Sequence, residues 1–223
     1  MRFKHYSFDL WLTIIRSNHE FKARRAQYFH EKYNGKNKSV EEVRHVFRNT
    51  DVMCNRINEV TGKNIDYDEM YLMIISAIND YDVDLGDVPV KEIYQELEDL
   101  FFRFRPVLYD ENTKRVLEVL KSTSGTNILS NTGFIKGDTL SKLLQELQID
   151  HLFDFQLYSD ETRISKPNPE FFNRMIAQLP AGLPLDQVVH VGDNPRADIL
   201  GAKAMGISAI QINSNEHRIQ DLV

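Results

Sequence analysis

The stretch SFDLWLT, residues 7–13, begins within the first apolar run of the chain and extends beyond it. It contains a single carboxylate, that of Asp9. Residues 3–9 have the composition of a short buried strand, which Asp9 ends. An aspartate after a strand is common in ordinary turns, where it accepts hydrogen bonds from the backbone. The meaning of Asp9 therefore depends on what the other strand ends carry.

Three later segments also place polar side chains at or after the ends of apolar runs. They are ILSN at residues 128–131, SKPNP at 165–169 and VGDN at 191–194, with Asp198 five positions after Asp193. In open parallel sheets, ligands bind outside the carboxyl ends of the strands. We therefore expect Asp9, Ser130 and Asp193 to meet in one pocket, although they are far apart in the sequence.

The pattern between these segments predicts the secondary structure. Residues 17–105 show helical periodicity and almost no strand pattern, with helices expected near 19–33, 39–62, 67–81 and 90–104. Ser17 and Glu20 have the spacing of a capping box for the first helix, and Ser39 can cap the second. After Pro106, helices near 112–122, 136–147, 169–178 and 196–205 alternate with strands near 126–130, 155–158, 188–191 and 209–212.

Strands that alternate with helices predict parallel βαβ units. The expected fold is therefore α/β, a Rossmann-like doubly wound parallel sheet interrupted after its first strand by an all-helical domain. We expect residues 1–15 and 107–223 to form the α/β core and residues 16–106 to form the helical domain. Since the insertion follows the first strand end, the helical domain should lie over the pocket.

Composition excludes several classes of protein. The 223 residues are 42% hydrophobic and 27% charged, as in ordinary globular proteins, and the net charge of −6 argues against a nucleic-acid binder. No apolar run approaches the ~20 residues of a membrane span, and the first ten residues leave no room for a signal peptide. Cys54 is the single cysteine, so no disulfide forms within the chain. We expect a cytoplasmic protein.

In this order, the four segments resemble the motifs of the haloacid dehalogenase (HAD) superfamily of aspartate-nucleophile hydrolases, over nearly the whole chain. The resemblance implies that Asp9 is the nucleophile and that Lys166 neutralises the nucleophile and the substrate. It also implies that Ser130 and Asn131 hold substrate oxygens together with Lys166. The helical insertion would be the cap domain of this superfamily.

The resemblance further implies a magnesium site. Asp9, Asp193 and the backbone carbonyl of Trp11 would hold Mg²⁺, which prefers oxygen ligands and few carboxylates. Asp198 would orient this group of ligands or the lysine, as residues behind a metal site commonly do. Gly192 is expected to let the backbone turn at the strand end.

Two positions depart from the superfamily pattern. Most HAD phosphatases carry a second aspartate two positions after the first, which protonates the leaving group and then activates water; here that position is Trp11. An indole N–H only donates a hydrogen bond. General acid–base catalysis contributes about 10²–10⁴-fold, so we expect slow turnover of alkyl phosphates. Leu12, where the superfamily usually has glycine, could alter the turn after Asp9.

The leading hypothesis is a Mg²⁺-dependent phosphatase that acts on a small phosphorylated metabolite through an aspartyl-phosphate. One alternative is a metal-independent 2-haloacid dehalogenase, because that branch also has an aromatic residue at the position of Trp11. The other is a non-catalytic protein that binds a phosphorylated ligand or a partner, which Trp11 and Leu12 would suit. Asp193 and Asp198 favour phosphoryl chemistry over the dehalogenase.

Other polar residues receive less specific interpretations. His19 is expected to be a solvated residue at a helix start, and His190 to pack on a face of the sheet. The basic residues near the start of the helical insertion could meet an anionic substrate, although a solvated face is the preferred interpretation; they are Arg16, Lys22, Arg24 and Arg25.

Overall fold

A five-stranded parallel sheet forms the centre of the computed structural model, which describes residues 3–223. The first two residues of the predicted core domain lie outside this range. The strands run in the order β5-β4-β1-β6-β7. They are β1 (His5–Phe8), β4 (Gly125–Ser130), β5 (Phe155–Tyr158), β6 (Val188–Gly192) and β7 (Ser208–Gln211). Because β1 is central and the chain winds outward on both sides, the predicted doubly wound α/β fold is confirmed.

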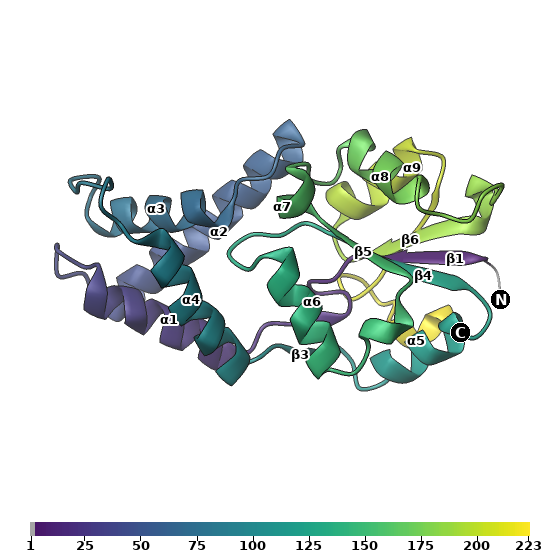
Figure 1. Ribbon diagram of the computed structural model, residues 1–223, viewed down its shortest axis with the longest axis horizontal. Coiled ribbons are helices and arrows are strands. Elements are labelled where there is room, and N and C mark those ends of the chain that lie inside the picture. Colours follow the sequence, from purple (N-terminus) through teal and green to yellow (C-terminus); the bar gives the residue numbers. More distant parts are fainter. Residues whose placement is uncertain (1–2) are drawn as a thin grey trace.

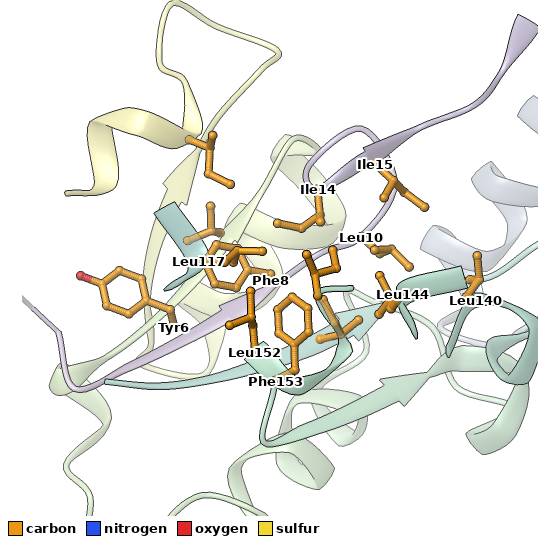
Figure 2. Packing of buried hydrophobic residues seen from close by; sticks show 14 of the residues in the cluster. Tyr6, Phe8, Leu10, Ile14, Ile15, Leu117, Leu140, Leu144, Leu152 and Phe153 are labelled. Atoms are coloured by element: carbon orange, nitrogen blue, oxygen red, sulfur yellow. The ribbon is translucent and has the colours of Figure 1, made fainter. Parts of the chain in front are cut away.

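Helices cover both faces of this sheet (Figure 1). On one face lie α5 (Thr113–Lys121) and α6 (Gly137–Glu146), which bury one apolar cluster against β1 and β4 (Figure 2). On the other face lie α8 (Pro169–Ile176) and α9 (Gly201–Ala204), which pack on a second cluster. Burial on both faces explains why the strands read as nearly continuous apolar runs.

Four helices form the insertion between β1 and β4. They are α1 (His19–Lys32), α2 (Val40–Thr61), α3 (Tyr67–Ile78) and α4 (Val90–Arg103), and they enclose an aromatic-rich core of their own. This group of helices lies beyond the carboxyl ends of the strands (Figure 1). Within residues 3–223, none of the helices has both the length and the apolar character that crossing a membrane requires.

Capping explains where the insertion's longest helix begins and ends. Ser39 and Glu42 form a reciprocal capping box at the start of α2, and Gly62 ends it with φ +67°. The Ser17–Glu20 box predicted for α1 is wrong. Asn18 is the N-cap instead, and its side chain accepts a hydrogen bond from the backbone of Glu20 at 2.9 Å.

Several short elements escaped the sequence analysis. An antiparallel pair, β2 (Ile15–Arg16) and β3 (Val107–Leu108), joins the two chain segments that lead into and out of the insertion. The helix predicted at 196–205 is divided into a π-helical turn, η3 (Pro195–Leu200), and α9. The remaining short helices are α7 (Ser159–Thr162), η1 (Asp150–Leu152), η2 (Leu185–Gln187) and η4 (Ile219–Leu222).

Candidate active site

Asp9 lies directly after the central strand β1, where it is only 6% exposed. Its Oδ1 accepts hydrogen bonds from Lys166 Nζ at 2.8 Å and from Ser130 Oγ at 3.3 Å. Its Oδ2 accepts one from Thr13 Oγ1 at 3.1 Å. Both oxygens are therefore oriented by donors, and the carboxylate has one defined position at the strand end.

Lys166 is a buried cation between two carboxylates. Its Nζ lies 2.8 Å from Asp9 Oδ1 and 2.7 Å from Asp198 Oδ1, and it donates to the carbonyl of Leu129 at 2.6 Å. Burial disfavours the charged amine, but Asp198 and Asp9 outweigh it and raise the pKa of Lys166. An ammonium group has three donors, and all three have acceptors here.

The loop that carries Lys166 is clamped by Asn131. The Asn131 amide donates to the Lys166 carbonyl at 3.0 Å and accepts from the Lys166 backbone N–H at 2.7 Å. Asn168 then caps α8 by accepting from the backbone of Glu170 at 3.0 Å. The Asn131 side chain is thus occupied in holding the lysine loop, and a contact of this residue with substrate would fall to its backbone N–H.

Ser130 lies behind Asp9. It is fully buried, and within the described part of the chain it is not among the residues that line the cavity beside Asp9. Its hydroxyl contacts Asp9 and the carbonyl of Asn131 at 3.2 Å. Direct contact between Ser130 and a substrate stays a prediction, whereas its contact with Asp9 is a feature of the structure.

Asp198 is paired on both oxygens. Besides Lys166, Oδ1 lies 3.2 Å from His190 Nε2, and Oδ2 accepts from the Asn194 backbone at 2.9 Å. Burial opposes ionisation, yet Lys166 and the hydrogen bond from His190 hold the pKa of Asp198 well below its usual range. Asp198 is therefore a permanent anion that fixes the lysine.

His190 does more than pack on the sheet. The ring is fully buried; its Nδ1 lies 3.0 Å from Ser7 Oγ and its Nε2 faces Asp198. Burial lowers the pKa of His190, so we assign a neutral ring that donates from Nε2 and accepts from Ser7. Sequence reasoning missed this chain of contacts because its members come from three separate elements.

Position 192 needs a glycine because the side chain of Asp198 packs directly against its backbone, and not because the turn needs an unusual conformation. A Cβ at this position would lie 2.2 Å from Asp198 Oδ2. Its φ is not among the positive values of this backbone, so the expected conformational role is wrong. Any larger residue would displace the carboxylate that holds Lys166.

Three carboxylates converge at the strand ends. Asp9, Asp193 and Asp198 each bring one oxygen within 4.8 Å of the others. Burial, only partly opposed by Lys166, raises the pKa of Asp9 to about 6, and burial together with the charge of Asp9 raises that of Asp193 to about 7. Asp198 is already paired on both oxygens, so a cation would bind to Asp193 and to the oxygen of Asp9 that does not face Lys166. These oxygen ligands and their uncompensated charge fit a small hard cation such as Mg²⁺.

A cavity of about 320 Å³ opens beside these residues. Asp9, Trp11, Lys166 and Asp193 line its inner end, and residues of α1 and α2 line the other end: Phe21, Lys22, Arg25, Asp51, Asn55 and Glu59. A volume of this size suits a small molecule. Any ligand that reaches Asp9 would therefore also contact the helical insertion.

The two departures from the superfamily pattern lie side by side. Trp11 is half-buried in the cavity wall, and no backbone hydrogen bond to its carbonyl occurs within residues 3–223. Leu12 is 50% exposed with φ +59°; its N–H donates to Ile15 at 2.7 Å and its carbonyl accepts from Asn213 at 2.8 Å. The turn after Asp9 thus forms with leucine in a left-handed conformation.

The basic residues near the start of α1 differ in exposure. Arg16, Lys22 and Arg24 are exposed, as is His19, in line with the solvated face that the sequence predicted. Arg25 is the exception, because its side chain is buried and lines the cavity. The expectation of a solvated face is therefore wrong for Arg25.

Two curated relatives are phosphatases. A phosphoserine phosphatase of Thermus thermophilus is 29% identical over 121 residues, which cover 53% of this chain and 47% of that protein. A glyceraldehyde 3-phosphate phosphatase of Methanothermobacter thermautotrophicus is 30% identical over 136 residues, or 57% of this chain and 59% of that protein. The matches span about half the length of these relatives.

A solved structure and a family model also match this chain over most of its length. YfnB of Bacillus subtilis, a HAD-hydrolase solved with bound magnesium, has a TM-score of 0.77 at 17% identity, covering 100% of this chain and 97% of YfnB. The family model of the haloacid dehalogenase-like hydrolases matches residues 3–206. Because this match includes all four strand-end segments around Asp9, the chain belongs to the haloacid dehalogenase-like hydrolases.

Proposed function

We propose that this hydrolase is a Mg²⁺-dependent phosphatase of a small phosphorylated metabolite, with Asp9 as its nucleophile. The observation that carries the proposal is the arrangement of Asp9, which Lys166 orients at 2.8 Å, beside the carboxylate of Asp193, which forms no ion pair within residues 3–223. The phosphatase relatives support the same class of reaction. Residues 16–106 would form the cap domain that closes the site.

In the first step, an Asp9 oxygen attacks phosphorus while the bond from phosphorus to the leaving oxygen breaks. The leaving alkoxide takes a proton from water, and the phosphoryl group stays on Asp9. In the second step, water attacks phosphorus, the bond to Asp9 breaks, and the water proton passes to solvent with release of orthophosphate. A covalent intermediate divides one difficult displacement into two easier ones.

A phosphoryl oxygen would replace one of the three present acceptors of Lys166, so that Lys166 and the backbone N–H of Asn131 would hold the phosphoryl group in both steps. Asp198 would keep Lys166 charged and in place, and Ser130 would orient Asp9. Asp9, Asp193 and the carbonyl of Trp11 would hold Mg²⁺, which lowers the charge repulsion between the carboxylates and the phosphoryl group. These roles extend the contacts described above to a bound substrate.

Trp11 makes the proposed phosphatase selective for good leaving groups. The indole supplies no proton to the leaving oxygen and takes none from the attacking water. Aryl phosphates should therefore form the aspartyl-phosphate much faster than alkyl phosphates, and hydrolysis of the intermediate should limit turnover. The 2-haloacid dehalogenase alternative shares an aromatic residue at this position, but it leaves the Asp193 carboxylate without a partner.

The test is release of p-nitrophenol from p-nitrophenyl phosphate, with and without Mg²⁺, in the wild type and in Asp9→Asn. We expect metal-dependent hydrolysis that the substitution abolishes, with a burst in the first turnover. Activity that survives in Asp9→Asn would overturn the role of Asp9. No hydrolysis in the wild type, with release of chloride from 2-chloropropionate in the presence of chelator, would favour the dehalogenase. If neither reaction occurs, stabilisation by a phosphorylated ligand that is unchanged in Asp9→Asn would favour the non-catalytic binding protein.

A further inference from the structure

Arg25 of α1 is a buried cation that forms no ion pair within residues 3–223, although the carboxylate of Asp51 attracts it from a longer distance. Its side chain is 9% exposed and lines the cavity at the end formed by the insertion. Within residues 3–223 its guanidinium makes neither a hydrogen bond nor an ion pair, and its Nε is buried with no acceptor. Arginine in a protein interior is normally paired, so this one is unusual.

Aromatic rings hold the guanidinium in place. Its central carbon lies 4.3 Å from the ring centre of Phe47, 4.5 Å from that of Phe134 and 5.4 Å from that of Phe21. Such contacts stabilise the cation and restrict its position. They supply no acceptor for its five N–H donors, which remain available to a ligand in the cavity.

The neighbouring acids do not neutralise Arg25. Glu59 is occupied: it accepts from Asn194 Nδ2 at 2.7 Å and lies 3.7 Å from Arg56. Asp51 accepts from Asn55 Nδ2 at 3.5 Å but forms no ion pair with Arg25 in the described structure. Lys22 adds a second cation to this wall. Asp51 is thus the one carboxylate of this wall that forms no ion pair in the described structure, and it faces two cations, Arg25 and Lys22, so this end of the cavity can accept one more negative charge.

We propose that Arg25 binds a second anionic group of the substrate, a carboxylate, while the phosphoryl group lies at Asp9. The planar fork of a guanidinium matches a carboxylate through two parallel hydrogen bonds, and an anion there would satisfy the buried donors. The substrate class is therefore a short phosphomonoester that carries a carboxylate. This inference rests on the proposed phosphatase function, because that function places the phosphoryl group.

The experiment compares two ligands of the same shape, phosphonoacetate and 2-methylpropylphosphonate, which differ in carboxylate against isopropyl. Neither contains a phosphate ester, so calorimetric titration in the presence of Mg²⁺ measures binding without turnover. We expect the wild type to bind phosphonoacetate at least about tenfold more tightly, as a charge-assisted pair provides. In Arg25→Met this preference should disappear.

Two variants serve as controls. Arg24 is the exposed neighbour of Arg25, with Glu20 3.7 Å away, so Arg24→Met should keep the wild-type preference. Arg25→Lys keeps the charge but not the fork, and it should retain part of the preference. It also provides a second test if methionine disturbs folding, which a thermal melt would reveal.

The outcomes separate this inference from the proposed function. Equal affinity of the wild type for the two ligands, or an equal loss of both in Arg25→Met, would overturn the carboxylate subsite and leave the phosphatase proposal intact. A preference that depends on Arg25, in a protein that releases no phosphate from any phosphomonoester, would support the subsite and overturn the phosphatase. If neither phosphonate binds, the carboxylate subsite is overturned, and hydrolysis of p-nitrophenyl phosphate decides the phosphatase proposal by itself.

Discussion

Trp11 occupies the position from which a second aspartate serves most phosphatases of this superfamily. It lines the cavity beside Asp9, yet an indole takes no part in proton transfer near neutral pH. The carboxylates of the same cavity wall, Asp51 and Glu59, come from the insertion and are engaged by Asn55 and Asn194. We therefore expect the side chain at position 11 to determine the rate of the proposed phosphatase reaction.

Trp11→Asp should restore a general acid and base. We expect kcat for alkyl phosphates to rise by about 10–100-fold, the lower part of the usual range for this kind of catalysis. For p-nitrophenyl phosphate kcat should also rise, because hydrolysis of the aspartyl-phosphate limits its turnover and the restored base activates the attacking water. Steady-state phosphate release measures both. Trp11→Phe is the control, and an aspartate variant no faster than the phenylalanine variant would disprove the account of Trp11.

The order of the strand-end segments along the chain predicted which polar side chains lie close together. The structure brings together four residues that the sequence placed at strand ends or next to prolines: Asp9, Lys166, Asp193 and Asp198. The sequence did not predict that Arg25 is buried. One helix turn carries Arg24 and Arg25, and which of them faces the cavity depends on how α1 packs against the loop of Phe134.

At the scale of elements, the turn after β1 stores strain at one residue. Leu12 adopts φ +59°, a conformation that is costly for a residue with a Cβ. The turn is nevertheless held by backbone hydrogen bonds from Leu12 to Ile15 at 2.7 Å and from Ile14 to Leu10 at 2.9 Å. The surrounding contacts therefore fix a conformation that glycine would adopt without strain.

Leu12→Gly should stabilise the protein. Glycine removes the strain of the left-handed backbone in the folded state but increases the conformational entropy of the unfolded chain. Because the first effect is the larger, we expect the free energy of unfolding to rise by about 0.5–1 kcal/mol. Thermal and urea denaturation measure it. Leu12→Ala removes the same exposed side chain but keeps the Cβ, so it should bring no gain; equal stabilisation by both variants would show that the backbone is not the cause.

Element boundaries were predictable where local chemistry sets them. Ser39 caps the start of α2 and the helix ends near residue 62, as expected; the structure adds the reciprocal bond with Glu42 and the left-handed conformation of Gly62. The box predicted for α1 failed because Asn18 is the better cap and also donates to the carbonyl of Arg105 at 3.4 Å, across the connection between insertion and core. The pairing of β2 with β3 was not predictable, because each strand has two residues and so short a segment shows no periodic pattern.

At the scale of the whole molecule, the insertion contacts the core at the loop that carries Lys166. Gly62, at the end of α2, accepts hydrogen bonds from Ser165 N–H at 3.1 Å and Asn168 Nδ2 at 3.0 Å. Asn64, two residues after Gly62, donates from its backbone to the carbonyl of Arg163 at 3.2 Å. Its Oδ1 accepts from Ser159 Oγ at 2.6 Å. The position of the helices is thus linked to that of the catalytic lysine proposed here.

Asn64→Ala should loosen this connection. Loss of a buried acceptor costs about 1–3 kcal/mol, which corresponds to about a tenfold or greater increase in local opening. We expect faster amide hydrogen exchange in residues 163–168 and a lower kcat/KM. Asn64→Gln keeps an amide that can accept from Ser159 and donate to Asp66, so it should change exchange much less. Unchanged exchange in the alanine variant would show that the loop is held by other contacts.

The most direct test of the central claim is to trap the phosphoryl group on Asp9. The enzyme is mixed with p-nitrophenyl phosphate and Mg²⁺, quenched in acid during steady-state turnover, and analysed by peptide mass spectrometry. Because Trp11 cannot activate water, hydrolysis of the intermediate should be slow, and most molecules should carry one phosphoryl group on the peptide that contains Asp9. Release of orthophosphate with no phosphoryl group on that peptide would contradict the mechanism.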